Sequence, residues 1–244
     1  MSEVMTGPQM ESKDPAKIEA MFSRIAPRYD IANRILSMGF DMPWRRKAVR
    51  LADPALGAEV LDMGCGTGDM MSVVLKRPGF RGRVIGVDLS QPMLDHAKRK
   101  LAGIRFDGIH MFRHGDALDG SEPDATFDLI MTCFGIRNFA DLRLAFSEVA
   151  RMLKPGGKFL VIEFFALDVE PWYVRLYLKH ILPTLGGLIS GGRFAYSYLS
   201  RSKEHFVSAD EFDAMGREYG LKTIARKPLT FGIAEIVLFE KEGH

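Results

Sequence analysis

Val60-Leu-Asp-Met-Gly-Cys-Gly-Thr-Gly68 is the stretch that decides the fold of this 244-residue chain. It begins as a short buried strand and ends in a turn with glycine at positions 64, 66 and 68. Glycine lets the backbone turn sharply and approach a ligand with no Cβ atom in the way. A helix is predicted to follow, and its N-terminus would present free N–H groups to a carboxylate or a phosphate. The stretch therefore predicts a strand, a turn and a helix with a ligand at the turn.

The turn differs from the dinucleotide-binding pattern G-x-G-x-x-G, which requires glycine at position 69. Asp69 stands there instead, and a carboxylate is unfavourable beside a pyrophosphate but tolerable beside a cationic amino-acid group. The alternative is a tight turn that binds nothing. That alternative does not account for three glycines together with Asp62, so we expect a ligand with a cationic part.

Strand and helix signals alternate along the middle of the chain. Strands are predicted at residues 59–63, 84–88, 109–113, 127–132 and 158–164, followed by closing strands at 222–228 and 233–241. Helices are predicted at residues 69–76, 90–101, 141–153 and 208–219, and Ser90 is the expected N-cap of the second. Alternation at this spacing indicates a parallel sheet with right-handed crossovers. The expected fold class is α/β: a Rossmann-like, mostly parallel seven-stranded sheet with an antiparallel final strand and helices on both faces, which is the layout of class I methyltransferases.

The chain is expected to divide into a lid and a main domain. Residues 1–50 are predicted to form an N-terminal helical lid segment, interrupted at Pro27 and at Pro43. Residues 51–244 are predicted to form the methyltransferase domain. An apolar, aromatic-rich insertion at about residues 170–206 breaks its alternation of strands and helices.

Composition excludes several classes of protein. Lys plus Arg total 33 against 31 for Asp plus Glu, a balance that argues against a nucleic-acid partner. The two cysteines lie in separate motifs, so no disulfide framework is expected. The polar first 20 residues predict no secretory signal, and no apolar run reaches the roughly 18 residues of a membrane span. A cytoplasmic protein is expected.

Three acidic residues follow three successive strands of the predicted sheet. Asp88 ends the second strand, where a carboxylate can accept hydrogen bonds from both ribose hydroxyls. Asp116-Ala117 follows the third strand, in position to bind an adenine amino group. Each acid alone is more often a surface cap. Together with Asp62 they predict one nucleoside site at the carboxyl ends of the strands.

Several further motifs carry a family resemblance over roughly residues 17–233. They are Tyr29-Asp30 with Asn33, Leu36-Ser37 with Gly39, Trp44-Arg45, Gly66-Thr-Gly-Asp69, Phe134-Gly-Ile-Arg-Asn138, Leu153-Lys-Pro-Gly-Gly157, Glu163-Phe164, Ala195-Tyr196, Tyr198-Leu199, and Leu229-Thr230 with Gly232. On these motifs the sequence resembles the UbiE/MenG/COQ5 family of ubiquinone/menaquinone biosynthesis C-methyltransferases. The resemblance implies S-adenosylmethionine as cofactor and C-methylation of the quinol ring of a polyprenylated quinone precursor.

The residues and the resemblance together define an expected cofactor site. Its members are Asp62, Gly64, Gly66, Thr67, Gly68, Asp88, Asp116, Ala117 and Cys133. The family usually has Ser at position 133, and a thiol is a weaker hydrogen-bonding group. Other departures bear on the substrate. They are Asp41 in place of the usual His, Gly120-Ser121-Glu122 in place of Leu-Pro-Phe, Phe165 in place of Ser, and Ala234-Glu-Ile-Val-Leu238 in place of an ending that contains His and Gly.

Methyl transfer to carbon requires a nucleophilic ring, which a quinol provides when one hydroxyl ionises. Arg137 is the expected stabiliser of that phenolate, and Asn138 would position the same oxygen. Arg137 could instead orient a water that takes the proton, or form a surface salt bridge with Asp141. Asn138 could simply cap the following helix.

Three tyrosines are expected near the acceptor. Tyr29, with Asp30 and Asn33, would close over the cofactor as part of the lid, or would pack in a core. Tyr196 and Tyr198 in the insertion would line the ring pocket, although aromatic residues more often serve packing. No metal site is expected. His110 and His114 share a face of a predicted strand, but they lack Cys or His partners elsewhere in the sequence.

Two other functions stay open: an O- or N-methyltransferase of the same fold acting on another apolar molecule, and a protein that binds the cofactor without turning it over. Residues 171–206 combine aromatic and basic residues, as interfacial elements do, so transient contact with a membrane surface is one hypothesis and a fixed cap the other. A homodimer, the type of ring and the prenyl length are left undecided.

Overall fold

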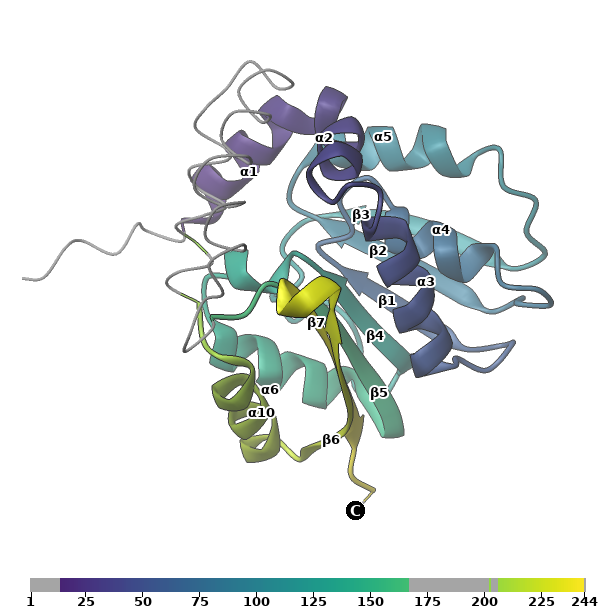
Figure 1. Ribbon diagram of the computed structural model, residues 1–244. Coiled ribbons are helices and arrows are strands. Elements are labelled where there is room, and N and C mark those ends of the chain that lie inside the picture. Colours follow the sequence, from purple (N-terminus) through teal and green to yellow (C-terminus); the bar gives the residue numbers. More distant parts are fainter. Residues whose placement is uncertain (1–13, 167–201, 203–205, 244) are drawn as a thin grey trace, which may run out of the picture.

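The computed structural model describes residues 14–166, 202 and 206–243. These residues form one seven-stranded sheet with the strand order β3-β2-β1-β4-β5-β7-β6 (Figure 1). The strands are β1 (Glu59–Met63), β2 (Arg83–Asp88), β3 (Ile109–His114), β4 (Phe127–Cys133), β5 (Leu153–Glu163), β6 (Leu221–Leu229) and β7 (Ala234–Lys241). β7 runs antiparallel to both of its neighbours, whereas β1 to β5 pair in parallel. The predicted α/β fold with an antiparallel final strand is therefore confirmed.

The described helices are α1 (Pro15–Ile25), α2 (Tyr29–Leu36), α3 (Asp41–Ala52), α4 (Asp69–Leu75), α5 (Gln91–Leu101), α6 (Leu142–Met152) and α10 (Ala209–Glu218), with short 3-10 helices η1 (Ala26–Arg28), η2 (Ile136–Asn138) and η4 (Thr230–Gly232). Four of the described α-helices, α1, α5, α6 and α10, begin at a residue whose side chain caps the helix. Ser90 Oγ accepts a hydrogen bond from the Met93 N–H at 3.3 Å, which confirms Ser90 as the predicted N-cap of α5. Asp141 caps α6 in the same way.

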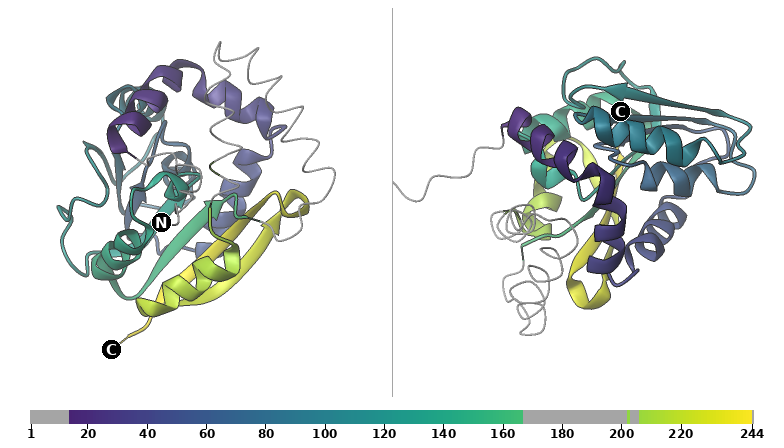
Figure 2. Two further views of the ribbon diagram at one scale, coloured as in Figure 1. Left: turned by 90° about the vertical axis from the view of Figure 1, so that its left-hand side faces the viewer. Right: turned by 90° about the horizontal axis from the view of Figure 1, so that it is seen from above.

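The sheet buries apolar side chains on both of its faces. On one face, α3, α4 and α5 pack over the strands through residues such as Ala48, Val74 and Leu94. On the other face, α6 and α10 enclose an aromatic cluster in which Phe146 and Phe212 have ring centroids 4.8 Å apart. The two helical layers are visible in Figure 2. This sandwich fixes the strand ends, and with them the loops that follow.

Most predicted element ends agree with the structure to within one residue, but two features differ more. β5 begins at Leu153 rather than at residue 158, because Leu153 pairs with Phe127 before an irregularity shifts the register. Pro43 does not break a helix but lies in the first turn of α3, where its missing N–H costs no hydrogen bond. Pro27 does interrupt the N-terminal helix, at η1.

The N-terminal elements have two different positions. α1 and α2 lie over the carboxyl ends of the strands, near the end of β2 (Figure 1). Both α1 and η1 contact α5. α3 instead packs against the sheet through buried Trp44, Ala48 and Val49. The part of the chain before β1 therefore both covers the strand ends and contributes to the core.

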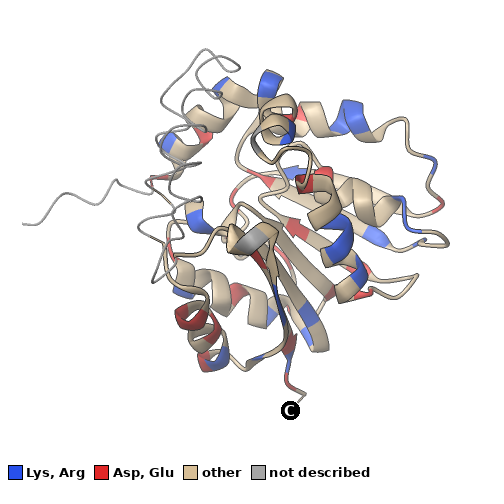
Figure 3. Ribbon diagram, in the orientation of Figure 1, with Lys and Arg blue, Asp and Glu red and all other residues tan. Residues whose placement is uncertain are grey.

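Charged residues are interspersed over the described helices, with a basic run on α3 and acidic residues on α10 (Figure 3). The acidic residues of the first turn of α10, Asp210 and Glu211, favour its N-terminus electrostatically. Within the described residues, none of the helices is long and apolar enough to cross a bilayer.

Candidate functional site

A solvent-open cleft with about 760 Å³ of empty space lies at the carboxyl ends of the strands, beneath α1. Six of the nine predicted cofactor residues line it: Gly64, Gly66, Asp88, Asp116, Ala117 and Cys133. Sequence reasoning did not anticipate its apolar wall, to which Phe22, Met93 and Phe139 contribute. We call this the main cleft.

A small pocket adjoins the main cleft and shares Tyr29, Gly64, Gly66 and Cys133 with it. Its remaining wall contains Asp62 and Thr67, both predicted, together with Arg45, Cys65, Asp69 and Met70. The two hollows therefore adjoin at the glycine turn.

The glycine turn works through backbone conformation. Gly64, Gly66 and Gly68 have φ values of +69°, +53° and +77°, a region that other residues adopt only with strain. Gly68 lines neither hollow. A Cβ there would lie 3.2 Å from Ala97 Cβ, so its smallness serves the packing of the turn against α5. The prediction of Gly68 as a ligand contact stays untested.

Asp88 supports the turn as well as facing the main cleft. Its Oδ2 accepts a hydrogen bond from the Gly66 N–H and its Oδ1 one from the Ser90 N–H, both at 2.8 Å. Burial raises the pKa of Asp88, and these two hydrogen bonds partly offset that rise. Each carboxylate oxygen has a second lone pair, so Asp88 can still accept from a diol.

Asp116 and Ala117 lie just beyond β3 on the wall of the main cleft. Asp116 Oδ1 accepts a hydrogen bond from the Leu118 N–H at 2.9 Å, which fixes the direction of the carboxylate. The structure therefore brings the acids that follow the second and third strands to one cleft, as the sequence predicted.

Asp62 is 1% exposed, and its Oδ2 has no hydrogen-bond partner within the described chain. Burial raises the pKa of Asp62 to about 8. An unsatisfied buried carboxyl oxygen on a pocket wall is costly unless a ligand donates to it. This free acceptor oxygen of Asp62 fits a bound ammonium group. Together with the glycine turn and Asp88, it fits an adenosyl amino acid.

Cys133 ends β4 and lines both hollows. Burial raises the pKa of its thiol to about 12. Cys133 is therefore neutral at physiological pH and contributes a weak donor and its backbone.

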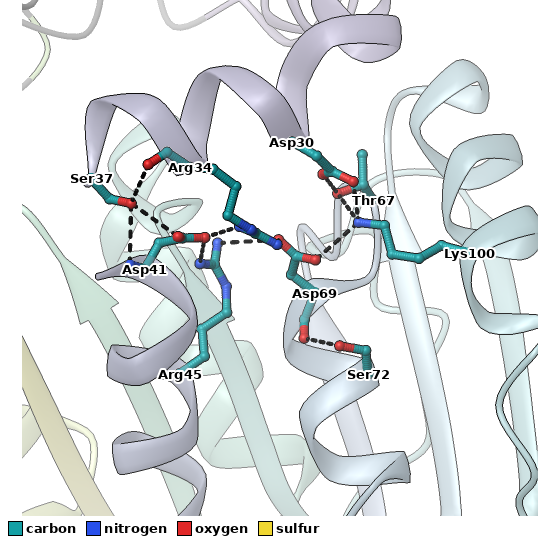
Figure 4. A network of polar contacts seen from close by, with 9 residues as sticks. All are labelled: Asp30, Arg34, Ser37, Asp41, Arg45, Thr67, Asp69, Ser72 and Lys100. Atoms are coloured by element: carbon teal, nitrogen blue, oxygen red, sulfur yellow. Dashed lines mark hydrogen bonds and ion pairs between the residues drawn. The ribbon is translucent and has the colours of Figure 1, made fainter. Parts of the chain in front are cut away.

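Ion pairs connect α2 to the glycine turn (Figure 4). Thr67 Oγ1 donates to Asp30 Oδ1 at 2.5 Å and accepts from Lys100 Nζ at 3.0 Å. Lys100 Nζ also lies 2.5 Å from Asp30 Oδ2 and 2.9 Å from Asp69 Oδ1. The Thr67 hydroxyl, which the resemblance assigned to the cofactor, is thus engaged with protein groups.

The same network continues to α3. Arg34 pairs with Asp41 and, at 3.0 Å, with Asp69, while Arg45 Nη1 donates to Asp41 Oδ2 at 2.8 Å. Asp69, the residue that replaces the third glycine of the dinucleotide pattern, is therefore the point where the N-terminal helices attach to the turn. The motifs Tyr29-Asp30 and Trp44-Arg45 marked these helices in the sequence, but the sequence did not predict their ion pairs with the glycine turn.

Phe134 is a cleft residue that sequence reasoning did not single out. Its φ is +58°, an uncommon value for a bulky residue. A 4.5 Å stack on Phe164 and a hydrogen bond from its N–H to the Ile162 carbonyl at 2.8 Å hold that conformation. Strain of this kind is common at ligand sites.

Arg137 is a buried residue rather than a surface one. Its Nη1 lies 2.5 Å from Glu163 Oε1 and donates to the Phe134 carbonyl at 3.0 Å. The suggested salt bridge with Asp141 does not form, because Asp141 caps α6. Burial raises the pKa of Glu163, and the Arg137 guanidinium offsets part of that rise.

Asn138 lines the main cleft, and its Nδ2 donates to the Phe134 carbonyl at 3.4 Å. It does not cap the following helix, since Asp141 does.

Tyr29 lines both hollows, with its ring edge-on to Phe22 at 6.1 Å, and burial raises the pKa of its hydroxyl. Tyr196, Tyr198 and nearly all of the predicted insertion lie outside the described residues.

The departures from the family pattern have structural roles away from the cleft. Asp41 is buried in the ion network, and Phe165 packs in the aromatic core. Glu122 pairs with Arg113 at 3.1 Å, and residues 234–238 supply buried positions of β7. Only Cys133, among these departures, lies on the cleft wall.

Known proteins with similar sequences are named as methyltransferases. The family model described as the ubiE/COQ5 methyltransferase family matches residues 9–240. A Thermus thermophilus protein named demethylmenaquinone methyltransferase is 42% identical over 88% of this chain and 97% of its own length. A Geobacter sulfurreducens protein named ubiquinone/menaquinone biosynthesis C-methyltransferase UbiE is 38% identical over 92% of this chain and 88% of its own length.

Solved structures share the fold. A chain from the complex between the Haloferax volcanii Trm112 methyltransferase activator and a methyltransferase superposes with a TM-score of 0.66 at 18% identity, over 91% of this chain and 98% of that one. Geranyl diphosphate C-methyltransferase from Streptomyces coelicolor, solved with S-adenosyl-L-homocysteine, gives a TM-score of 0.58 at 18% identity, over 80% of this chain and 78% of that one. At these identities the likeness concerns the fold alone.

The pKa of Asp62 leads to a pH-dependent affinity for S-adenosylhomocysteine. Below about pH 8 the free carboxyl is protonated, whereas a bound ammonium favours the carboxylate, so binding releases a proton. Affinity should therefore rise between pH 6 and pH 8, by up to about tenfold per unit, and level off above. Calorimetry in buffers of different ionisation enthalpy measures both quantities. An Asp62→Asn variant should show a flatter profile; an equally steep one would remove Asp62 from the ammonium site.

Proposed function

The chain belongs to the ubiE/COQ5 methyltransferase family, and from this premise we propose that it methylates a ring carbon of a polyprenylated quinol with S-adenosylmethionine. A naphthoquinol of the demethylmenaquinol type is the proposed acceptor. The observation that carries the proposal is a cleft lined by Asp88, Asp116 and several aromatic residues in a chain matched by this family over residues 9–240. The name of the Thermus relative supports the choice of the naphthoid ring.

The cofactor is proposed to span the two hollows. Asp88 would accept the ribose hydroxyls, Asp116 with Ala117 would bind the adenine, and Asp62 would accept from the ammonium group. What supports this placement is that Gly64 and Gly66 line both hollows.

When bound, the cofactor supplies an electrophilic methyl group on a sulfonium whose leaving group departs neutral. The protein therefore needs no acid to activate it. Its tasks are to align the ring carbon with the methyl group, to stabilise the ionised hydroxyl of the acceptor and to exclude water.

The wall of the main cleft suits a flat apolar ring. Phe22, Tyr29, Phe134 and Phe139 line it, and aromatic rings offer large, rigid faces for stacking. Asn138 is proposed to donate to the acceptor oxygen, because it lies on this wall beside Phe134. A polyprenyl chain partitions into lipid, so we also propose transient contact with a membrane surface during substrate capture.

Arg137 is proposed to stabilise the phenolate from behind Phe134. Its Nη1 is committed to Glu163 and the Phe134 carbonyl, and its Nε donates to Ser202 Oγ at 3.4 Å. Nη2 carries two further N–H donors. A permanent cation in a site shielded from water stabilises a developing negative charge more strongly than it would in solution.

Methyl transfer to a short-chain demethylmenaquinol tests the proposed function. The protein, incubated with deuteriomethyl-labelled cofactor and the reduced naphthoquinol, should yield a product labelled on the ring carbon, identified by mass spectrometry and NMR. The oxidised quinone should give no product, because it has no hydroxyl to ionise. Labelling on oxygen would favour an O-methyltransferase, and cofactor binding without turnover would favour a purely binding protein.

Arg137 can be tested only together with Glu163, because removing one partner of a buried ion pair costs about 3–5 kcal/mol of stability. The double variant Arg137→Gln/Glu163→Gln removes both charges. We expect it to fold and to bind S-adenosylhomocysteine within about threefold of the wild type, while kcat falls roughly 100-fold or more.

Arg137→Lys is the control, because it keeps a cation that can pair with Glu163. Thermal melting reports the fold, and steady-state assays report kcat. A folded double variant with the kcat of the wild type would show that Arg137 serves packing only.

A further inference from the structure

Arg45 is a buried cation on the wall of the small pocket. It has no role in the function proposed so far. It is 4% exposed and extends from α3. Its Nη1 donates to Asp41, its Nη2 lies 4.0 Å from Asp69, and its Nε has no partner within the described chain. A buried N–H without an acceptor is costly, so this edge of the guanidinium is suited to a ligand.

The carboxylates near Arg45 have other cations. Asp69 lies 2.9 Å from Lys100 Nζ and 3.0 Å from Arg34 Nη2 (Figure 4). Asp41 also pairs with Arg34 and accepts from Ser37 Oγ at 2.9 Å. Lys100 is also shared with Asp30 at 2.5 Å, so Arg34 and Lys100 face three carboxylates and Arg45 supplies the third cation. That pairing uses Nη1 of Arg45 and leaves its Nε without an acceptor within the described chain.

The orientation of the Arg45 guanidinium is fixed before any ligand arrives. Its Cζ lies 5.6 Å from the centroid of the Phe134 ring, and Asp41 holds Nη1. This leaves the Nε–Nη2 edge, which matches the two oxygens of a carboxylate. A group held in this way loses little freedom on binding.

Two unsatisfied groups of opposite kind belong to residues that line the small pocket. Arg45 contributes an N–H without an acceptor, and Asp62 contributes an oxygen without a donor. An α-amino acid carries a carboxylate and an ammonium on one carbon, so it answers both needs at once. Glycines of the turn line both this pocket and the main cleft, whose acids are proposed to hold the nucleoside.

We propose that Arg45 binds the α-carboxylate of the cofactor through its Nε–Nη2 edge, opposite Asp62. The inference rests on the proposed function, since it takes S-adenosylmethionine as the ligand. Arg45 is then a specificity residue: it distinguishes a nucleoside that carries an amino acid from one that does not.

Calorimetry with two ligands isolates this contact. S-adenosylhomocysteine carries the amino-acid carboxylate, whereas methylthioadenosine has the same nucleoside without the amino acid. Arg45→Gln should weaken S-adenosylhomocysteine binding roughly 10- to 100-fold, as expected for a charge-assisted contact, and change methylthioadenosine binding by less than about threefold.

Arg34→Gln is the matched control. Arg34 pairs with the same two carboxylates, Asp41 and Asp69, but is not on the described wall of either hollow. Its loss should affect both ligands equally. Equal weakening of both ligands by Arg45→Gln would make Arg45 a structural residue and overturn the inference.

A comparison on the wild-type protein decides the matter even if Arg45→Gln fails to fold. S-adenosylmethionine should bind at least about tenfold more tightly than its decarboxylated analogue, which keeps the ammonium and lacks the carboxylate. Equal affinities would overturn the inference while leaving the cofactor assignment intact. No binding of either ligand would instead refute the proposed function.

Discussion

The backbone leaves β1 and enters α4 through residues 64–68, and three of these have positive φ. That constraint determines much else in the molecule. It places the N-terminus of α4 beside the end of β2, where Asp88 bonds the Gly66 N–H at 2.8 Å, and it brings the turn close to α5 at Gly68. Both hollows open on this turn, so the position of any ligand depends on it.

The N-terminal helices are attached to the same turn by charge. Asp69 and Lys100 link α2 to α4 and α5, while Arg34, Asp41 and Arg45 link α2 to α3. Because several of these groups are buried, the ion pairs act where solvent screens them little. The same ion pairs therefore hold the N-terminal helices over the strand ends and form part of the wall of the small pocket.

Much of this arrangement could be predicted from the sequence, because its signals are local. Strand and helix periods, Ser90 as a cap and the glycines at 64, 66 and 68 act over a few residues. The pairing of Arg137 with Glu163, and of Asp69 with Arg34 and Lys100, could not be predicted. These partners lie 26 or more residues apart, and only the completed sheet brings them together. The same is true of Arg45, whose unpaired Nε is a property of its surroundings.

Hydrogen–deuterium exchange with and without S-adenosylhomocysteine tests most directly whether the glycine turn and the N-terminal helices form one cofactor site. The account predicts new protection in residues 64–69, 88–90 and 115–118, and also in α1 and α2 over residues 15–33, with α6 and α10 unchanged. Protection confined to the sheet edge at β6 and β7, or protection of the turn with none in α1 and α2, would contradict it.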